Sequence, residues 1–317
     1  MTVKPLTNAF YAKDFIETAE GLLFAVVVSG VEQEKILCFL RYAYQQNGWK
    51  KQTTEQANQL LNQYYPNYLH YSHKLDAHLH AVPVDNIIKH YQPKQRLQEL
   101  LKCTQLLHSV ERDVIQLLQL FQQHSIDLTH LGITGSILLG VQNQQSDIDL
   151  LCYERDTFQQ CRQLIAMLIK QNSLQALSDN DWQESWQRRD CTLNFADYVW
   201  HEQRKYNKGM IANRKFDLSF IDPEQLAIPE YQKKGSINLQ CKVLDDSYAF
   251  DYPAKFIIDH PTIQSVVSFT ATYNGQAQRG ELIEVAGMLE QSSEELRIVV
   301  GSSREAFGEY IKVIHEK

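Results

Sequence analysis

The stretch Leu131–Tyr153, LGITGSILLGVQNQQSDIDLLCY, places two carboxylates inside an apolar run. Its opening predicts a short strand that ends at Gly135–Ser136, and the apolar residues around Asp147 and Asp149 predict a second strand. Residues two apart on a strand project to the same face, so we expect the two aspartates to lie side by side. Such carboxylates repel each other unless a cation neutralises them, and Mg²⁺ or Mn²⁺ prefers hard oxygen ligands of this kind.

The Gly135–Ser136 turn adds a second chemical feature to this segment. A glycine at a strand-to-helix turn lets the backbone approach a phosphate, and the N–H groups that follow favour anions. The hydroxyl of Ser136 is a further donor. A phosphate cradle beside metal-binding carboxylates is typical of sites that handle a nucleoside triphosphate (NTP).

Gly-Ser, ten intervening residues and then Asp-x-Asp, with apolar flanks, resembles the motif of the DNA polymerase β-like nucleotidyltransferase superfamily. The resemblance implies that Ser136 and the Gly135–Ser136 backbone contact the triphosphate and that Asp147 and Asp149 hold two metal ions. It also implies a third carboxylate from a later strand. Asp217, in the strand-like run KFDLSFI, is the residue that matches. Its implied role is to bind metal and to orient or deprotonate the attacking hydroxyl.

The wider layout resembles an uncharacterised prokaryotic group of predicted nucleotidyltransferases. Three N-terminal segments carry that likeness: Asp14–Ile16, Gly21–Val26 and Leu40–Tyr42. In this group an N-terminal region precedes the catalytic domain and an all-β module follows it. The resemblance covers nearly the whole chain, but only its middle part carries mechanistic information.

Length and patterning predict an α+β protein of three domains, with boundaries at 1–93, 94–232 and 233–317. The first is a small α+β unit with a helix over Gln52–Tyr65, and Pro93 marks the break that follows it. The second is the nucleotidyltransferase core of a mixed sheet with helices. Its first helical stretch runs from Gln95 to His124, and another helix begins with Thr157 as its N-cap.

The third predicted domain differs from the others in its predicted secondary structure, which consists of short strands at close spacing. We expect a small OB-like barrel, followed by a terminal helix in the stretch REAFGEYIKVI (304–314). OB folds often bind oligonucleotides. Residues 236–317, however, contain twelve acidic and seven basic side chains, which disfavours a basic binding surface and leaves a packing role open.

Composition bounds the function further. The 317 residues are 44% hydrophobic and 22% charged, which is ordinary for a globular protein and excludes disordered and fibrous classes. The net charge of −7 means that nucleic-acid binding needs a local basic patch. Six cysteines without a CxxC pair indicate reduced thiols. With no signal-peptide core and no apolar run near the roughly 18 residues of a membrane span, we expect a cytoplasmic protein without membrane contact.

One local basic patch is present between the aspartate strands. Residues 187–216 contain seven basic and three acidic side chains. Arg204, Lys205 and Lys208 are the preferred phosphate contacts, because the segment connects the strand of Asp149 with that of Asp217. A solvated loop and helix face is the equal alternative. The aromatic residues Trp182, Trp186, Tyr198 and Trp200 lie nearby, and core packing is favoured over base stacking.

These features predict a Mg²⁺- or Mn²⁺-dependent nucleotidyltransferase that moves a nucleoside monophosphate from an NTP, such as ATP, to a hydroxyl and releases pyrophosphate. RNA, tRNA, a protein side chain or a small molecule are the candidate acceptors, with RNA slightly favoured by the appended domains. The alternative is a retired transferase fold that binds a nucleotide or RNA without turnover. A toxin–antitoxin transferase module is disfavoured by the length. The sequence leaves the oligomeric state and the preferred base open.

Overall fold

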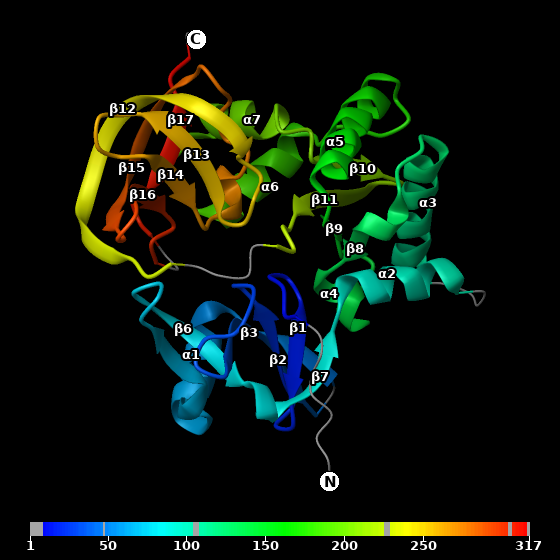
Figure 1. Cartoon of the computed structure of the whole chain (residues 1–317). Coiled ribbons are helices and arrows are strands. Elements are labelled where there is room, and N and C mark those ends of the chain that lie inside the picture. The colour runs from blue at the N-terminus through cyan, green and yellow to red at the C-terminus, as the bar shows by residue number, and fades with distance from the viewer. Residues whose placement is uncertain (1–8, 47, 104–107, 225–228, 304–305, 316–317) are drawn as a thin grey trace.

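A computed structural model describes residues 9–46, 48–103, 108–224, 229–303 and 306–315. It is a mixed α+β structure built on three separate sheets (Figure 1). The three sheets follow one another along the chain and form three lobes, coloured blue, green and yellow to red in Figure 1. No helix in the described parts of the chain has both the length and the apolar character that crossing a membrane requires.

The N-terminal lobe is a seven-stranded sheet in the order β5-β6-β3-β2-β1-β7, with β4 paired to β3. The long β3 and the short β4 form a hairpin that extends beyond the other strands. A capped helix covers the sheet and buries Ala57 and Leu61, so the helix predicted over Gln52–Tyr65 is confirmed. The elements are β1 (Phe15–Thr18), β2 (Leu22–Val26), β3 (Lys35–Gln45), β4 (Gly48–Lys51), α1 (Thr54–Tyr64), η1 (Pro66–Tyr68), β5 (Leu69–Ser72), β6 (Ala77–Pro83), η2 (Val84–Asn86) and β7 (Ile87–Tyr91).

The central lobe is a four-stranded sheet in the order β10-β11-β9-β8. Strand β11 runs parallel to β9, and the other neighbours are antiparallel. Helices bury apolar faces against this sheet; Val114, Leu117 and Phe121, for example, are fully buried. The elements are α2 (Pro93–Lys102), α3 (Ser109–Gln123), η3 (Leu128–His130), β8 (Leu131–Ile133), α4 (Gly135–Leu139), β9 (Ile148–Cys152), α5 (Arg155–Lys170), β10 (Lys208–Ile211) and β11 (Arg214–Phe220).

Two helix predictions in this lobe need correction. The stretch predicted as helical from Gln95 to His124 forms two helices, since α2 ends at Lys102 and α3 begins at Ser109. Helix α5 starts earlier than predicted, because the carboxylate of Glu154 accepts the N–H groups of Asp156 and Thr157 at 2.9 and 2.6 Å. Glu154, rather than Thr157, therefore caps the helix.

The C-terminal lobe is a six-stranded sheet in which the pairings run β12-β13-β14-β16-β15, with β17 on β15. Strand β15 also pairs with β12, so the hydrogen-bonded order returns to its first strand. The predicted terminal helix is wrong, because residues 310–313 pair with β15 as a strand. The elements are β12 (Gln232–Tyr248), β13 (Ala254–Asp259), β14 (Ser265–Ser268), η4 (Ala271–Tyr273), β15 (Leu282–Gln291), β16 (Leu296–Val300) and β17 (Tyr310–Val313).

Helices α6 (Asp179–Arg189) and α7 (Phe195–Gln203) pack on the C-terminal sheet, although they precede it in the chain. Trp182 and Tyr198 are buried in the same hydrophobic cluster as the inner faces of its strands. These aromatic side chains therefore have the packing role that the sequence favoured. The predicted boundary at 232/233 follows the chain order and separates these helices from the sheet on which they pack.

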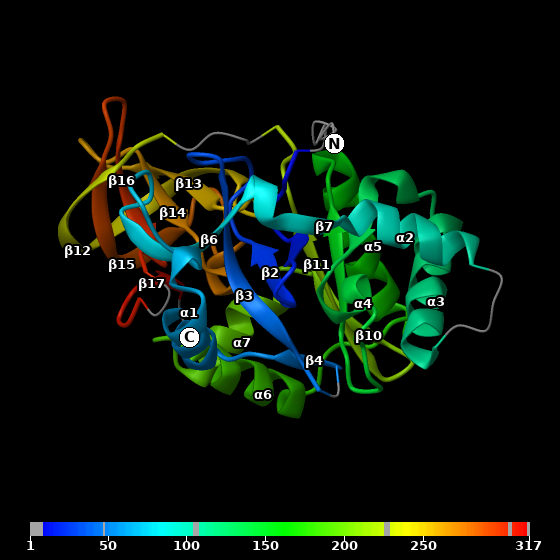
Figure 2. The same cartoon turned by 90° about the horizontal axis from the view of Figure 1, so that it is seen from below.

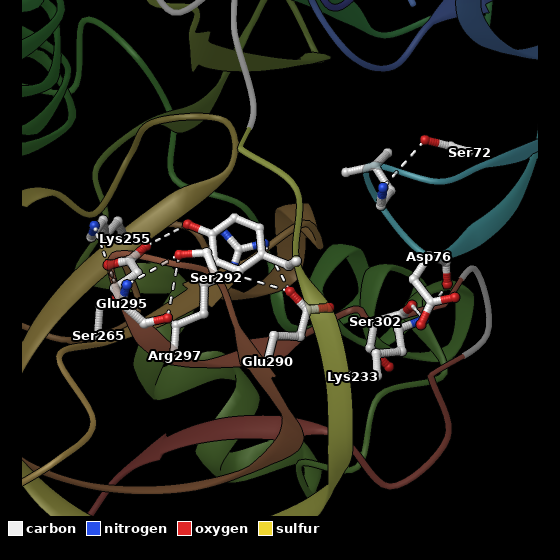
Figure 3. Close-up of polar contacts among 12 residues, drawn as sticks. Ser72, Asp76, Lys233, Lys255, Ser265, Glu290, Ser292, Glu295, Arg297 and Ser302 are labelled. Carbon is white, nitrogen blue, oxygen red and sulfur yellow. Dashed lines mark hydrogen bonds and ion pairs between the residues drawn. The ribbon is translucent and has the colours of Figure 1, made fainter.

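Hydrogen bonds and ion pairs join the three lobes, whose arrangement is seen from below in Figure 2. The hydroxyl of Thr134 donates to the main-chain oxygen of Lys13 at 2.7 Å, which joins the N-terminal and central lobes. Arg155 binds both carboxylate oxygens of Asp251 at 2.6 and 2.9 Å, which joins the central and C-terminal lobes. Lys233 at the start of β12 donates to the main-chain oxygens of Asp76 and Ser302 (Figure 3). Each lobe thus contacts the other two.

Candidate active site

Strands β9 and β11 bring the three predicted aspartates into one cavity. The parallel register places Asp217 directly opposite Asp149, and Asp147 precedes β9 by one residue. The alternate residues Ile148 and Leu150 are buried in the core, which turns the aspartates to the open face. All three line a cavity of about 770 Å³.

Gly135 and Ser136 line the same cavity, at the first turn of α4. The main chain enters this turn from β8, and the N–H of Thr134 donates to the main-chain oxygen of Asp149 at 2.9 Å. Gly135 has a φ of +67°, and a Cβ atom there would clash with Oδ2 of Asp149. The position therefore requires glycine for two reasons, the left-handed backbone and the closeness of the carboxylate.

The electrostatics of the cavity fit a site that receives cations. Burial, reinforced by the neighbouring Asp217, raises the pKa of Asp149 to about 6. Burial also raises the pKa of Asp147, while Arg188 and Lys215 act in the opposite direction. A divalent cation would relieve the repulsion among these carboxylates, so the donor set fits Mg²⁺ or Mn²⁺. The arrangement does not by itself form a closed site: among the described residues, no three His, Cys, Asp or Glu side chains are grouped tightly enough to hold an ion.

Of the three predicted phosphate contacts, only Lys208 lines the cavity. Strand β10 places it opposite Asp217, and its ammonium lies 3.7 Å from Oδ2 of that carboxylate. The same ammonium contacts the buried Glu202. Lys208 is thus held between a structural and a candidate catalytic carboxylate.

The predicted phosphate contacts Arg204 and Lys205 lie away from the cavity, and their positions do not fit that role. Arg204 pairs with Glu281 at 2.6 Å and covers the ring of Trp200. Lys205 is only 2% exposed and donates to Glu202 at 2.5 Å and to the main-chain oxygen of Thr272 at 2.7 Å. Both cations therefore join α7 to the C-terminal lobe, and a count of charges along the segment could not reveal these partners.

Lys13, which the sequence analysis did not select, lies at the junction of the lobes near the aspartates. Its half-buried side chain lies 5.5 Å from the ring centroid of Tyr252 and forms no ion pair within the described part of the chain. Burial lowers its pKa, and the charges of Asp149 and Asp217 oppose that effect. No local signal marks this lysine, because only the docking of the lobes brings it there.

The remaining walls of the cavity come from segments that the sequence analysis did not connect with the site. The β3–β4 hairpin contributes Arg41, Tyr42, Trp49, Lys50 and Lys51. One face of α6 contributes further charged residues at helical spacing, Asp181, Glu184, Arg188 and Arg189 among them. The cavity is therefore formed by the N-terminal lobe, the central lobe and α6 together.

The geometry agrees with a comparison to known families. A model of the nucleotidyltransferase domain matches residues 114–217, a range that begins in α3 and ends at Asp217. The chain belongs to the polymerase β-like nucleotidyltransferase superfamily. It is also 34% identical to an uncharacterized protein of Methanocaldococcus jannaschii, over 95% of this chain and 98% of the relative. This chain and its archaeal relative therefore belong to one family, and their match spans nearly the whole length of both. No solved structure matches the chain.

Proposed function

We propose that this protein is a metal-dependent nucleotidyltransferase that transfers a nucleoside monophosphate from an NTP to an acceptor hydroxyl. The observation that carries the proposal is the convergence of Asp147, Asp149 and Asp217 with the Gly135–Ser136 turn in one cavity. The family supports nucleotidyl transfer in general. Metal dependence and the residue roles are our inference from the donor set and its charge.

Asp147, Asp149 and Asp217 would hold divalent Mg²⁺ or Mn²⁺, which supplies positive charge for the triphosphate and the attacking oxygen when bound. Ser136 and the backbone of Gly135 approach the triphosphate, and the ammonium of Lys208 adds a positive charge beside Asp217. Asp217 orients the acceptor hydroxyl and accepts its proton. A bond forms between the acceptor oxygen and the α-phosphorus, the bond from that phosphorus to the bridging oxygen breaks, and pyrophosphate leaves.

The acceptor that we propose is an RNA, and we further propose that the C-terminal lobe is an OB-like barrel. The closed order of strand pairings in that lobe supports the second point. The proposal of an RNA acceptor is supported by the lobes on both sides of the central sheet, because such lobes can select a large substrate.

The test is thermal unfolding of the full-length chain with each NTP, with and without Mg²⁺ or Mn²⁺. A ligand at about 100 times its dissociation constant adds roughly 2.7 kcal/mol to the free energy of unfolding. We expect a metal-dependent rise of the midpoint that Asp147→Asn removes. Asp259→Asn is the matched control, because this aspartate is exposed on β13 away from the cavity.

Transfer itself is measured with an NTP labelled at the α-phosphate and a mixture of RNA acceptors. Incorporation that is lost in Asp147→Asn but kept in Asp259→Asn would support catalysis. A metal-dependent shift without any incorporation would instead support the retired fold that binds a nucleotide without turnover.

A further inference from the structure

The wall of the active-site cavity that comes from the N-terminal lobe is made by the β3–β4 hairpin. Register pairs Tyr42 with Lys51 and Tyr44 with Trp49, so the hairpin presents aromatic and basic side chains together. The strand β4 approaches β10 and α4 in Figure 2, in agreement with the shared cavity lining. This wall faces the aspartates although about 100 residues of chain separate the two.

Three positive charges of this wall lack an ion-pair partner among the residues that the structure describes. Within the described part of the chain, Arg41, Lys50 and Lys51 form no ion pair, although each lines the cavity. On the α6 wall Arg188 and Arg189 also form none, and the Nε atom of Arg189 is buried without a hydrogen-bond partner. These five cations are therefore available to an anionic ligand.

Other basic residues of the cavity are already neutralised, which sets the five apart. Lys215 binds Asp181 at 2.8 Å and Glu184 at 2.9 Å. Lys208 contacts Glu202 and lies beside Asp217. With divalent cations on the aspartates, the cavity would carry more positive charge than one triphosphate balances. A second ligand with phosphate groups fits that excess.

The aromatic side chains of the hairpin narrow the class of this second ligand. Trp49 lines the cavity, and Tyr44 packs edge-on against it with ring centroids 5.3 Å apart. Tyr42 lines the same cavity as Asp149, so the aromatic wall reaches toward the aspartates. Cations that follow a phosphate backbone, combined with rings on which bases stack, are typical of surfaces that bind single-stranded nucleic acid.

We propose that the β3–β4 hairpin and the C-terminal turn of α6 bind the acceptor, and that the acceptor is the 3′ end of a single-stranded polynucleotide. This inference rests on the proposed function, because it supplies the hydroxyl that the aspartates activate. The 3′ oxygen attacks the α-phosphorus, the strand grows by one nucleotide, and pyrophosphate and the proton of the hydroxyl leave. Trp49 stacks on a base of this strand, and its phosphates are contacted by Arg41, Lys50 and Lys51.

The first experiment measures the affinity of the full-length protein for a fluorescent 12-nucleotide RNA, and for the matching DNA, by anisotropy without NTP. We expect Lys50→Glu/Lys51→Glu to weaken binding at least tenfold and to lower the slope of log affinity against log salt by about 1.4, since each lost phosphate contact on a single strand removes about 0.7. The control is Arg112→Glu/Lys170→Glu, which reverses two exposed charges outside the cavity and should leave affinity unchanged.

The second variant set tests stacking. We expect Trp49→Ala to weaken binding by about 5- to 150-fold and Trp49→Phe to keep most of the affinity, because both indole and phenyl rings stack. Primer extension with a labelled NTP, on RNA and DNA with free or dideoxy 3′ ends, shows which sugar is used. Extension of free ends alone supports the proposal.

The outcomes separate this inference from the proposed function. Wild-type RNA and DNA affinity in both hairpin variants would overturn the inference, even if Mg²⁺ and NTP shift the wild type and not Asp147→Asn. The inference of a polynucleotide acceptor would also be overturned by an acidic peptide that binds the wild type and Trp49→Ala equally and receives the labelled nucleotide when RNA does not. Loss of the NTP shift in the hairpin variants with unchanged RNA affinity would assign these cations to the triphosphate instead. Hairpin-dependent RNA binding without any NTP shift or incorporation would refute the proposed function and leave the hairpin as a binding surface.

Discussion

Two glycines on either side of α4 provide a sharp test of the site, because they share a backbone conformation and differ in surroundings. Gly135 has a φ of +67° and Gly140 a φ of +70°. A Cβ atom at Gly135 would clash with Oδ2 of Asp149, whereas one at Gly140 would meet nothing within 4 Å. Comparing Gly135→Ala with Gly140→Ala therefore separates backbone strain from displacement of the carboxylate.

A positive φ strains the backbone in both variants. A left-handed alanine costs about 1–2 kcal/mol, and each kcal/mol lowers the unfolding midpoint by about 2–4 °C in a protein of comparable size. Both midpoints should thus fall by similar amounts. The clash in Gly135→Ala meets the free end of a side chain, which rotates away at little further cost in stability but leaves the position that metal binding needs.

The assay is the metal-dependent shift of the midpoint with NTP, measured on both variants beside the wild type. We expect Gly140→Ala to keep the full shift and its transfer activity, and Gly135→Ala to lose both. A shift in Gly135→Ala equal to that of Gly140→Ala would refute the reasoning, since it would mean that the position of the Asp149 carboxylate is unimportant for ligand binding.

Three other predictions follow from the charges. Burial and Asp217 raise the pKa of Asp149 to about 6. Between about pH 4 and pH 6 the folded metal-free protein therefore keeps a proton that the unfolded chain has released. The free energy of unfolding should fall as the pH rises through this range. Asp149→Asn should accordingly raise the midpoint at pH 7.5 in a chelator and leave it unchanged near pH 4; an unchanged midpoint at both would contradict the shift. Lys205→Met should destabilise the fold by about 1–3 kcal/mol in denaturant titrations, because the buried Glu202 loses one of its two ammonium partners and keeps only Lys208. Arg204→Ala should lower stability by about 1 kcal/mol or less with unchanged NTP affinity, as expected for a partly exposed pair outside the cavity.

The sequence predicted the central sheet and its aspartates well because their signals are local. Gly135–Ser136, Asp147 and Asp149 fall within one short stretch whose apolar flanks define two neighbouring strands. Asp217 could be found as a lone carboxylate in a strand-like run, and the parallel register with β9 explains why it lies beside Asp149. Spacing, together with the resemblance to the superfamily that indicated Asp217, therefore identified residues that share one cavity.

The errors and omissions arise from contacts between distant segments. Arg204 and Lys205 resemble phosphate contacts in a list of charges, but partners on α7 and in the C-terminal lobe occupy them. Lys13 and the β3–β4 hairpin reach the site only through the docking of lobes, and single-sequence patterning carries no information on that docking. The terminal segment was predicted as helix because β17 forms only through pairing with β15, about 30 residues earlier in the chain.

The parallel pairing of β9 with β11 has a consequence for when the proposed active site is assembled. Parallel neighbours need a long crossover, and here residues 153–213 carry α6 and α7, which take their hydrophobic partners from strands made later. During synthesis, α6 and α7 emerge before the strands on which they pack, so we expect Asp217 to settle beside Asp147 and Asp149 only once the last lobe has formed. We expect a chain cut after residue 232 to retain Asp147, Asp149 and Asp217 and still to lose the metal-dependent shift with NTP, so that this shift would report completion of the whole molecule.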